Sequence, residues 1–139
     1  MKRAWILGWI AIAATSGCAS LPAYTFQPGE ITATVNLKGV PAPSFCAGGT
    51  VYKFTPDKQG RAHVPVGKRI DVNSFVYLSG YQQYWTCHAG MSFVPEASLS
   101  YLVNLEMRDQ ACRVEIYREG ASNRTGLDLE PSFGRPSCR

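Results

Sequence analysis

The chain has 139 residues, of which 45% are hydrophobic, and its 14 Lys and Arg against 10 Asp and Glu give a formal net charge of +4. This length suits one domain with a single modest core. The arginines are scattered among carboxylates and form no run, so we expect neither a basic groove nor a nucleic-acid partner.

The first 18 residues have the layout of an export signal. Lys2 and Arg3 form a basic start, residues 4–14 carry no charge, and residues 15–17 are small and lead into Cys18. The uncharged run is too short for a transmembrane helix, which needs about 20 residues. We therefore expect an exported chain whose signal segment is residues 1–17.

The small residues that end in Cys18 resemble the lipobox of bacterial lipoproteins. This resemblance implies cleavage before Cys18 and acyl chains on the new N-terminal cysteine, which would anchor the protein without a transmembrane helix. Ala19 is not the Asp that retains lipoproteins at the inner membrane. The implied location is thus the periplasmic side of the outer membrane, with residues 18–29 as a short tether. Ordinary signal cleavage near Ala19 or Ala23, or an uncleaved anchor, is the alternative.

Four cysteines remain in the exported part, and they are Cys46, Cys87, Cys112 and Cys138. An even number in a small exported chain predicts two disulfides. Of the three pairings we favour Cys46–Cys87 with Cys112–Cys138, because a bridge near the C-terminus would hold the tail. No two of these cysteines have CxxC spacing, so we expect no metal site, and nothing else in the sequence calls for a cofactor.

The first half of the exported chain has the patterns of four strands. These patterns fall at residues 31–37, 50–54, 61–66 and 68–78. The first alternates apolar and polar residues, and the others are rich in β-branched and aromatic residues. Pro56 and Gly60 suit a turn between the second and third strands. A change of apolar phase at residues 73–74 predicts a bulge in the fourth.

The second half continues with a loop, a short strand, a long strand, a hairpin turn, a returning strand and a short edge strand. The loop covers residues 80–90, the short strand 91–94 and the long strand 97–107. The hairpin turn covers residues 108–110, the returning strand 111–118 and the edge strand 126–129. The long strand has the clearest alternation, with its odd positions facing inward. The returning strand places Cys112 beside the core.

Turn signals recur through the exported part about every 8 to 12 residues, and no long stretch has helical periodicity with caps. The predicted fold class is therefore all-β. We expect residues 30–139 to form one two-sheet antiparallel β-sandwich of about seven strands.

Several motifs support a named resemblance. Pro56-Asp57, Gly60-Arg61-Ala62 and the corner at residues 64–69 resemble the turn, strand and corner of transthyretin-like and carboxypeptidase-regulatory-like sandwiches. Together with residues 92–96, Tyr101 and Cys112, they are similar to small Gram-negative lipoproteins. The resemblance implies a transthyretin- or immunoglobulin-like sandwich, and a shared fold implies no particular activity.

The sequence offers little for catalysis. His63 and His88 are the only histidines, and each would have to serve as the base of a hydrolase. The first lies in a short strand and the second adjoins Cys87, so structural or solvent-facing roles are favoured. The carboxylates lie at turns and on hairpin surfaces. We expect no catalytic residue and no enzymatic activity.

Aromatic residues with polar tips gather at Tyr77, Tyr81, Tyr84 and Trp85. Such residues are enriched where proteins bind one another, because they bury a large area and lose little rotamer freedom. These four are the candidate partner-binding residues. The alternative is that Tyr77 and Trp85 pack in the core or cover a Cys46–Cys87 disulfide.

We therefore expect a non-catalytic cell-envelope lipoprotein that acts as a periplasm-facing protein-binding module. Its partners would be the membrane, through its lipid, and another envelope or secreted protein. One alternative is an immunity or inhibitor lipoprotein that blocks a periplasmic toxin or wall hydrolase. Another is a lipoprotein that binds a glycan or a small ligand.

Overall fold

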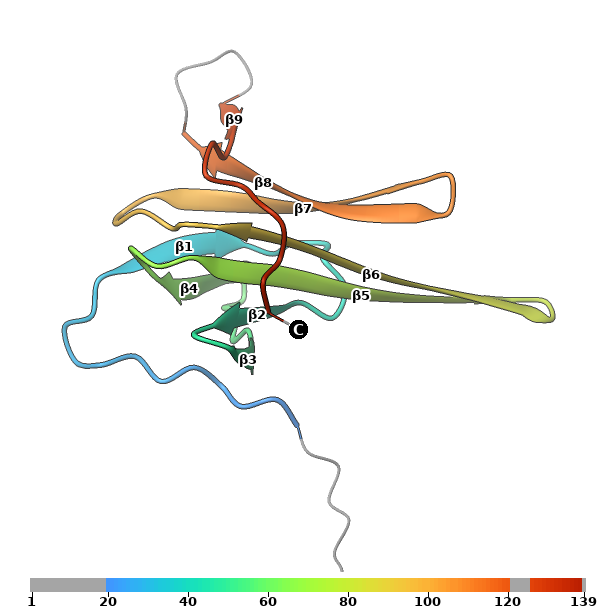
Figure 1. Cartoon of the computed structure of the whole chain (residues 1–139), viewed down its shortest axis with the longest axis horizontal. Helices are drawn as coiled ribbons and strands as arrows, with labels where there is room; N and C mark the ends of the chain where they lie inside the picture. The colour runs from blue at the N-terminus through green and yellow to red at the C-terminus, as the bar shows by residue number, and fades with distance from the viewer. Residues whose placement is uncertain (1–19, 121–125, 139) are drawn as a thin grey trace, which may run out of the picture.

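The computed structural model of the chain describes residues 20–120 and 126–138, and the expected signal segment with Cys18 lies outside them. This part of the chain contains nine β-strands and no helix (Figure 1). Their bounds are β1 (Thr32–Asn36), β2 (Ser44–Ala47), β3 (Thr50–Lys53), β4 (Arg61–Pro65), β5 (Ile70–Gly80), β6 (Gln83–Phe93), β7 (Ser100–Arg108), β8 (Ala111–Glu119) and β9 (Leu127–Leu129). No helix long and apolar enough to cross a membrane is found there.

The strands form two sheets that pack together, which confirms an all-β, two-sheet fold. The five-stranded sheet has the order β4-β1-β7-β8-β9, and the four-stranded sheet has the order β3-β2-β5-β6. All neighbours are antiparallel except β1 and β7, which are parallel. The prediction of about seven strands in antiparallel sheets was therefore wrong on both counts. The parallel pair arises because the chain crosses to the other sheet and back between β1 and β7.

Strand β2 was not predicted from the sequence. This strand has only four residues, lies between Pro43 and Gly48, and buries two successive side chains, Phe45 and Cys46. It therefore shows neither the length nor the alternation by which strands are recognised. The turn around residues 56–60, the strand after it and the short edge strand near residues 126–129 are all present.

The core lies between the sheets and is filled by alternating side chains of both. Its most deeply buried apolar residues are Val35, Phe45, Val64, Ile70, Val72, Phe93, Tyr101, Val103, Val114 and Ile116. Each aliphatic or aromatic side chain removed from water in this way stabilises the fold by about 1.5 to 3 kcal/mol. The alternation predicted for β1 and β7 is confirmed in their centres. At their ends Ile31 and Met107 are exposed by 62% and 53%.

Strands β5 and β6 form one long hairpin with an unbroken register from Ile70 opposite Phe93 to Gly80 opposite Gln83. The predicted bulge at residues 73–74 and the predicted loop at residues 80–90 were both wrong. Even-numbered residues of β5 face inward throughout, and Ser74 takes an inward position that a hydrophobic pattern does not reveal. Phe75 points outward, and its ring lies 4.5 Å from that of His88.

Strands β7 and β8 form the second long hairpin, as predicted. Its two turn residues, Asp109 and Gln110, have φ angles of 50° and 66°. Positive φ at both central residues is typical of the type I′ turn, whose twist matches that of the flanking strands. Both hairpins extend in the same direction beyond the shorter strands (Figure 1).

The segment before β1 lies against the domain. Lys53 N donates to Pro22 O at 2.9 Å, and Ala23 forms a parallel bridge with Lys53. The Tyr24 ring packs 5.1 Å from that of Tyr52. Part of the expected tether, from Pro22 on, is therefore docked on the sheet.

Candidate functional site

The outer part of the β5–β6 hairpin, residues 76–87, projects from the four-stranded sheet as a two-stranded ribbon, which we call the aromatic arm. Strand β2 pairs with β5 only from Ile70 to Asn73, and no other strand pairs with β5 or β6 along the arm. A lone two-stranded ribbon is marginally stable in water. The aromatic arm therefore needs support from outside its own sheet.

That support comes from the β7–β8 hairpin, which lies beside the arm. A disulfide joins Cys87 on β6 to Cys112 on β8, with 6.2 Å between the Cα atoms. Trp85 Nε1 donates a hydrogen bond to Gln110 O at 3.2 Å in the β7–β8 turn. The two ribbons brace each other through one covalent bond and one indole contact.

The second disulfide joins Cys46 to Cys138, also with 6.2 Å between the Cα atoms. The prediction of two disulfides is confirmed, but the favoured pairing, Cys46–Cys87 with Cys112–Cys138, was wrong. The reason is topological, because β8 faces β6 from the other sheet, whereas the tail crosses the four-stranded sheet to β2.

The C-terminal tail is fixed along this crossing by backbone and side-chain contacts. Ser92 and Gly134 exchange two backbone hydrogen bonds at the free edge of β6. Buried Asp71 accepts the N–H groups of Ser137 and Cys138 on Oδ2, at 2.7 and 2.5 Å. The tail covers the inner half of the sheet's outer face and leaves the aromatic arm uncovered.

The four predicted partner-binding residues all lie on the aromatic arm. Tyr81 is 92% exposed, Tyr84 75% and Tyr77 58%, whereas Trp85 is half-buried. Tyr77 and Tyr84 stack on the outer face with their ring centroids 6.3 Å apart. Trp85 and the facing Leu78 lie on the other face, toward the β7–β8 hairpin. Three tyrosines are therefore available together, and Trp85 mainly supports them.

Three further residues of this surface, Phe75, Leu78 and His88, were not predicted. Phe75 and Leu78 are exposed apolar side chains, Leu78 on the face toward the β7–β8 hairpin and Phe75 on the outer face, where its ring packs against that of His88. A signal in the sequence could have found them, because no Asp, Glu, Lys or Arg occurs between Asp71 and Glu96. A run of this length without charge is unusual for strands that face water on one side.

The neighbouring β7–β8 hairpin has the opposite character. Glu106 pairs with Arg108 at 3.1 Å and with Arg113 at 2.5 Å, and Arg113 also pairs with Glu115 at 2.8 Å. Burial opposes ionisation of Glu115, but hydrogen bonds from Tyr117 and Asn104 and the charge of Arg113 lower its pKa. One ribbon is thus charged and self-paired, and the other is uncharged and aromatic.

Two clefts lie where the ribbons meet. One, of about 360 Å³, is lined by Leu78, Trp85, Met107 and the turn at residues 108–111. The other, of about 480 Å³, lies between residues 39–41, residues 76–78, Leu105 and Met107. Both are largely apolar and open, and they extend the apolar surface of the aromatic arm onto its inner side.

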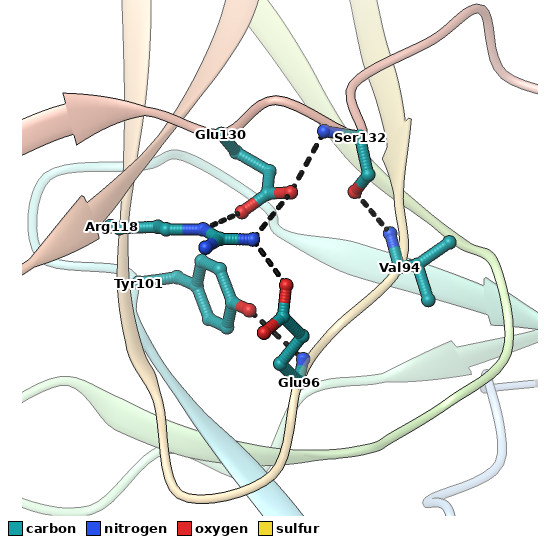
Figure 2. Close-up of polar contacts among 6 residues, drawn as sticks. All are labelled: Val94, Glu96, Tyr101, Arg118, Glu130 and Ser132. Carbon is teal, nitrogen blue, oxygen red and sulfur yellow. Dashed lines mark hydrogen bonds and ion pairs between the residues drawn. The ribbon is translucent and has the colours of Figure 1, made fainter.

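A second cluster of polar residues lies at the other end of β8. Arg118 Nε donates to Glu130 Oε2 at 2.6 Å, and its Nη2 pairs with Glu96 (Figure 2). Glu130 also accepts the N–H of Ser132 at 2.9 Å. Burial opposes ionisation of Glu130, but the hydrogen bonds from Arg118 and Ser132 outweigh it and hold the pKa below its ordinary value. Both carboxylates are engaged by one cation.

This cluster ties three chain segments together. Glu96 N donates to the Tyr101 hydroxyl at 2.9 Å, and Val94 N donates to Ser132 Oγ at 2.9 Å (Figure 2). Burial raises the pKa of the Tyr101 hydroxyl, which keeps it neutral. We interpret the cluster as a structural brace between β8, the β6–β7 connection and the tail.

The two histidines lie on different strands of different sheets. His63 is exposed on β4, and its Nδ1 lies 3.1 Å from Thr32 Oγ1. His88 stacks on Phe75. Over residues 20–120 and 126–138, no three or more His, Cys, Asp or Glu side chains gather as metal ligands would.

Comparison with known proteins gives no relative for this chain. No protein-family model, no curated protein and no solved structure matches it.

Proposed function

We propose that this chain is a non-catalytic cell-envelope lipoprotein whose aromatic arm binds another envelope or secreted protein. The observation that carries the proposal is the joint exposure of Tyr77, Tyr81 and Tyr84 on an uncharged ribbon. Tyrosine is enriched at protein interfaces, and charged residues are depleted from interface cores. The arm has this composition on both counts.

The bracing of the arm favours binding of a partner. A ribbon held by the Cys87–Cys112 bridge and the Trp85 hydrogen bond loses little conformational freedom when a partner docks. Two of its rings, those of Tyr77 and Tyr84, are already stacked in the free chain. The cost of ordering is therefore small, and more of the contact free energy remains for affinity.

The proposed anchor is an acylated Cys18 in the periplasmic leaflet of the outer membrane, and the proposed fold family is a transthyretin-like sandwich. Pro22 is already bonded to β3, so about four residues would separate the lipid from the sheet. An extended chain of that length spans about 14 Å. The domain would then sit close to the bilayer surface.

An immunity or inhibitor lipoprotein is the second candidate. The observation that favours it is the tip of the arm, where a two-residue turn of Tyr81 and Gln82 carries the most exposed large apolar side chain among the described residues. A narrow two-stranded ribbon with an aromatic side chain at its tip can enter the active-site cleft of a hydrolase. The identity of the captured partner separates this candidate from an assembly role.

Affinity capture from the envelope fraction tests the proposed function. We expect the tagged chain to retain a discrete protein partner, and the Tyr81→Ser/Tyr84→Ser variant to lose it by at least 10-fold. The matched control is Ile31→Ser/Phe133→Ser, which removes two large exposed apolar side chains, 62% and 49% exposed, that lie away from the arm. Equal capture by both variants would contradict the proposal.

The anchor has its own test. Mass spectrometry of the native protein should find Cys18 as an acylated N-terminal residue. The Cys18→Ser variant should move from the membrane to the soluble envelope fraction. An unacylated chain that begins elsewhere would contradict the lipoprotein assignment and leave the arm's role untouched.

A further inference from the structure

The free edge of β6 offers unpaired backbone groups along the aromatic arm. Gly80 and Gln83 flank a two-residue turn, so odd-numbered residues of β6 exchange hydrogen bonds with β5. Even-numbered residues therefore aim their N–H and C=O groups away from β5. At Tyr84, Thr86 and His88 these groups have no backbone partner among the described residues.

The chain itself uses this edge at the next residues along. Ser92 is also an even-numbered residue of β6. Its N–H donates to Gly134 O at 3.0 Å, and its C=O accepts the N–H of Gly134 at 2.8 Å. The tail then turns away over Gly90, where a Cβ would lie 3.0 Å from Pro136. The edge from Tyr84 to His88 is thus a direct continuation of an edge that already accepts an antiparallel bridge from the tail at Ser92.

The edge also lacks the usual protection against strand addition. Natural edge strands carry charges, prolines or bulges that discourage pairing with another chain. Strand β6 has none of these, since its register is unbroken and it contains no charged residue or proline. The exposed edge of β8, in contrast, lies beside the ion pairs of Arg113 and Glu115.

We propose that the partner of the aromatic arm contributes an extended, uncharged peptide segment that pairs antiparallel with β6 at Tyr84, Thr86 and His88. This inference rests on the proposed function and specifies how the arm binds. Alternate side chains of the segment would lie on the outer face, against the Tyr84 ring, which stacks on Tyr77, and the His88 ring, which packs on Phe75. The recognised chemistry is a short strand with apolar residues at every second position.

A displayed library of random 12-residue peptides, selected on the purified full-length chain with both disulfides formed, provides the probe. We expect the enriched peptides to share apolar residues at alternate positions and to contain no proline in the pairing segment. Thr86→Pro removes one outward N–H without breaking a bond to β5, so it should weaken binding by at least 10-fold. Thr86→Ala keeps that N–H and should bind within about 2-fold of the wild type.

A second measurement leaves the protein unchanged and so does not depend on how a variant folds. Two versions of the best peptide are compared, one N-methylated at its odd positions and one at its even positions. One version should lose binding and the other should keep it, because only one of these two sets of N–H groups faces β6. The proposal would be overturned if both methylated peptides bind equally, if binding survives Thr86→Pro, or if no peptide is enriched. A dimer of this chain that Thr86→Pro dissociates would also overturn it, because the edge would then hold a second copy.

The test of strand pairing and the test of the proposed function can give different outcomes. If envelope capture depends on Tyr81 and Tyr84 but not on the Thr86 N–H, the arm binds its partner through side chains alone. The proposed function then stands and strand pairing is wrong.

Discussion

Glu130 is a fully buried acid whose two carboxylate oxygens are both occupied. A buried charge is tolerated only when it is paired and hydrogen-bonded, and Arg118 and Ser132 meet that requirement here. Glu96 binds the same guanidinium from a far more exposed position. The two carboxylates that bind Arg118 are therefore expected to differ in their contribution to stability, because they differ in burial.

The Glu130→Gln variant should lower the free energy of unfolding at pH 7 by on the order of 2 to 4 kcal/mol, since it leaves Arg118 without its buried charge partner. Because the folded pKa of Glu130 lies below its ordinary value, its contribution is present above that value and is lost as the pH falls through it. The difference between wild type and variant should thus shrink below about pH 4.3.

Glu96→Gln is the control for this measurement, because its exposed pair should contribute less than about 1 kcal/mol. Chemical denaturation at several pH values measures both variants. A Glu130→Gln chain as stable as Glu96→Gln at pH 7 would show that the brace adds little.

At the scale of single residues, sequence patterns predict burial well in strand centres and poorly at strand ends. Val35, Val103 and Val114 follow the alternation and are buried. Ile31 and Met107 follow it too, yet both are exposed. Alternation assigns a face to a residue, and only the opposing sheet decides whether that face is covered.

At the scale of elements, the two long hairpins are the main feature, and the sequence predicted one of them. Strands β7 and β8 alternate apolar and polar residues over most of their length around a short turn. Strand β6 carries glycine and polar residues on a ribbon largely exposed to water, so its sequence resembles a loop. Its strand state depends on pairing with β5 and on the brace to β8, which no local pattern encodes.

Non-reducing peptide mapping should find Cys46 joined to Cys138 and Cys87 joined to Cys112. Both pairings connect elements that are distant in sequence and adjacent only through the topology of the two sheets. Recovery of a peptide joining Cys46 to Cys87 would contradict the described arrangement of the arm and the tail.

Removing each bridge should affect a different region. Cys87→Ser/Cys112→Ser should speed amide hydrogen exchange along both ribbons, because the aromatic arm then lacks its covalent support. Cys46→Ser/Cys138→Ser should instead free the tail, with faster exchange at Ser92 and Gly134.

The two variants also serve as controls for each other in thermal unfolding. In the chain-entropy model the bridge with a sequence separation of 92 stabilises by about 4.5 kcal/mol, and that with a separation of 25 by about 3.5 kcal/mol. Exchange that rises uniformly over the whole domain in both variants would argue against local bracing.

At the scale of the whole molecule, the docked N-terminal segment and the tip of the aromatic arm lie apart from each other. The described chain begins beside β3, where Pro22 and Tyr24 are docked, while the tip of the aromatic arm lies at one extreme of the long axis (Figure 1). The core, the Arg118 brace and the two disulfides hold these regions in a fixed relation. On this account the arm is presented by a rigid body instead of a flexible loop.

The central claim is that the aromatic arm touches a partner in the cell, and site-specific photo-crosslinking tests it most directly. A photoreactive phenylalanine analogue in place of Tyr84 should give one discrete protein adduct in living cells. The same analogue in place of Arg113, exposed on the charged ribbon, should not give that adduct. No adduct at Tyr84, or the same adducts from both positions, would contradict the account.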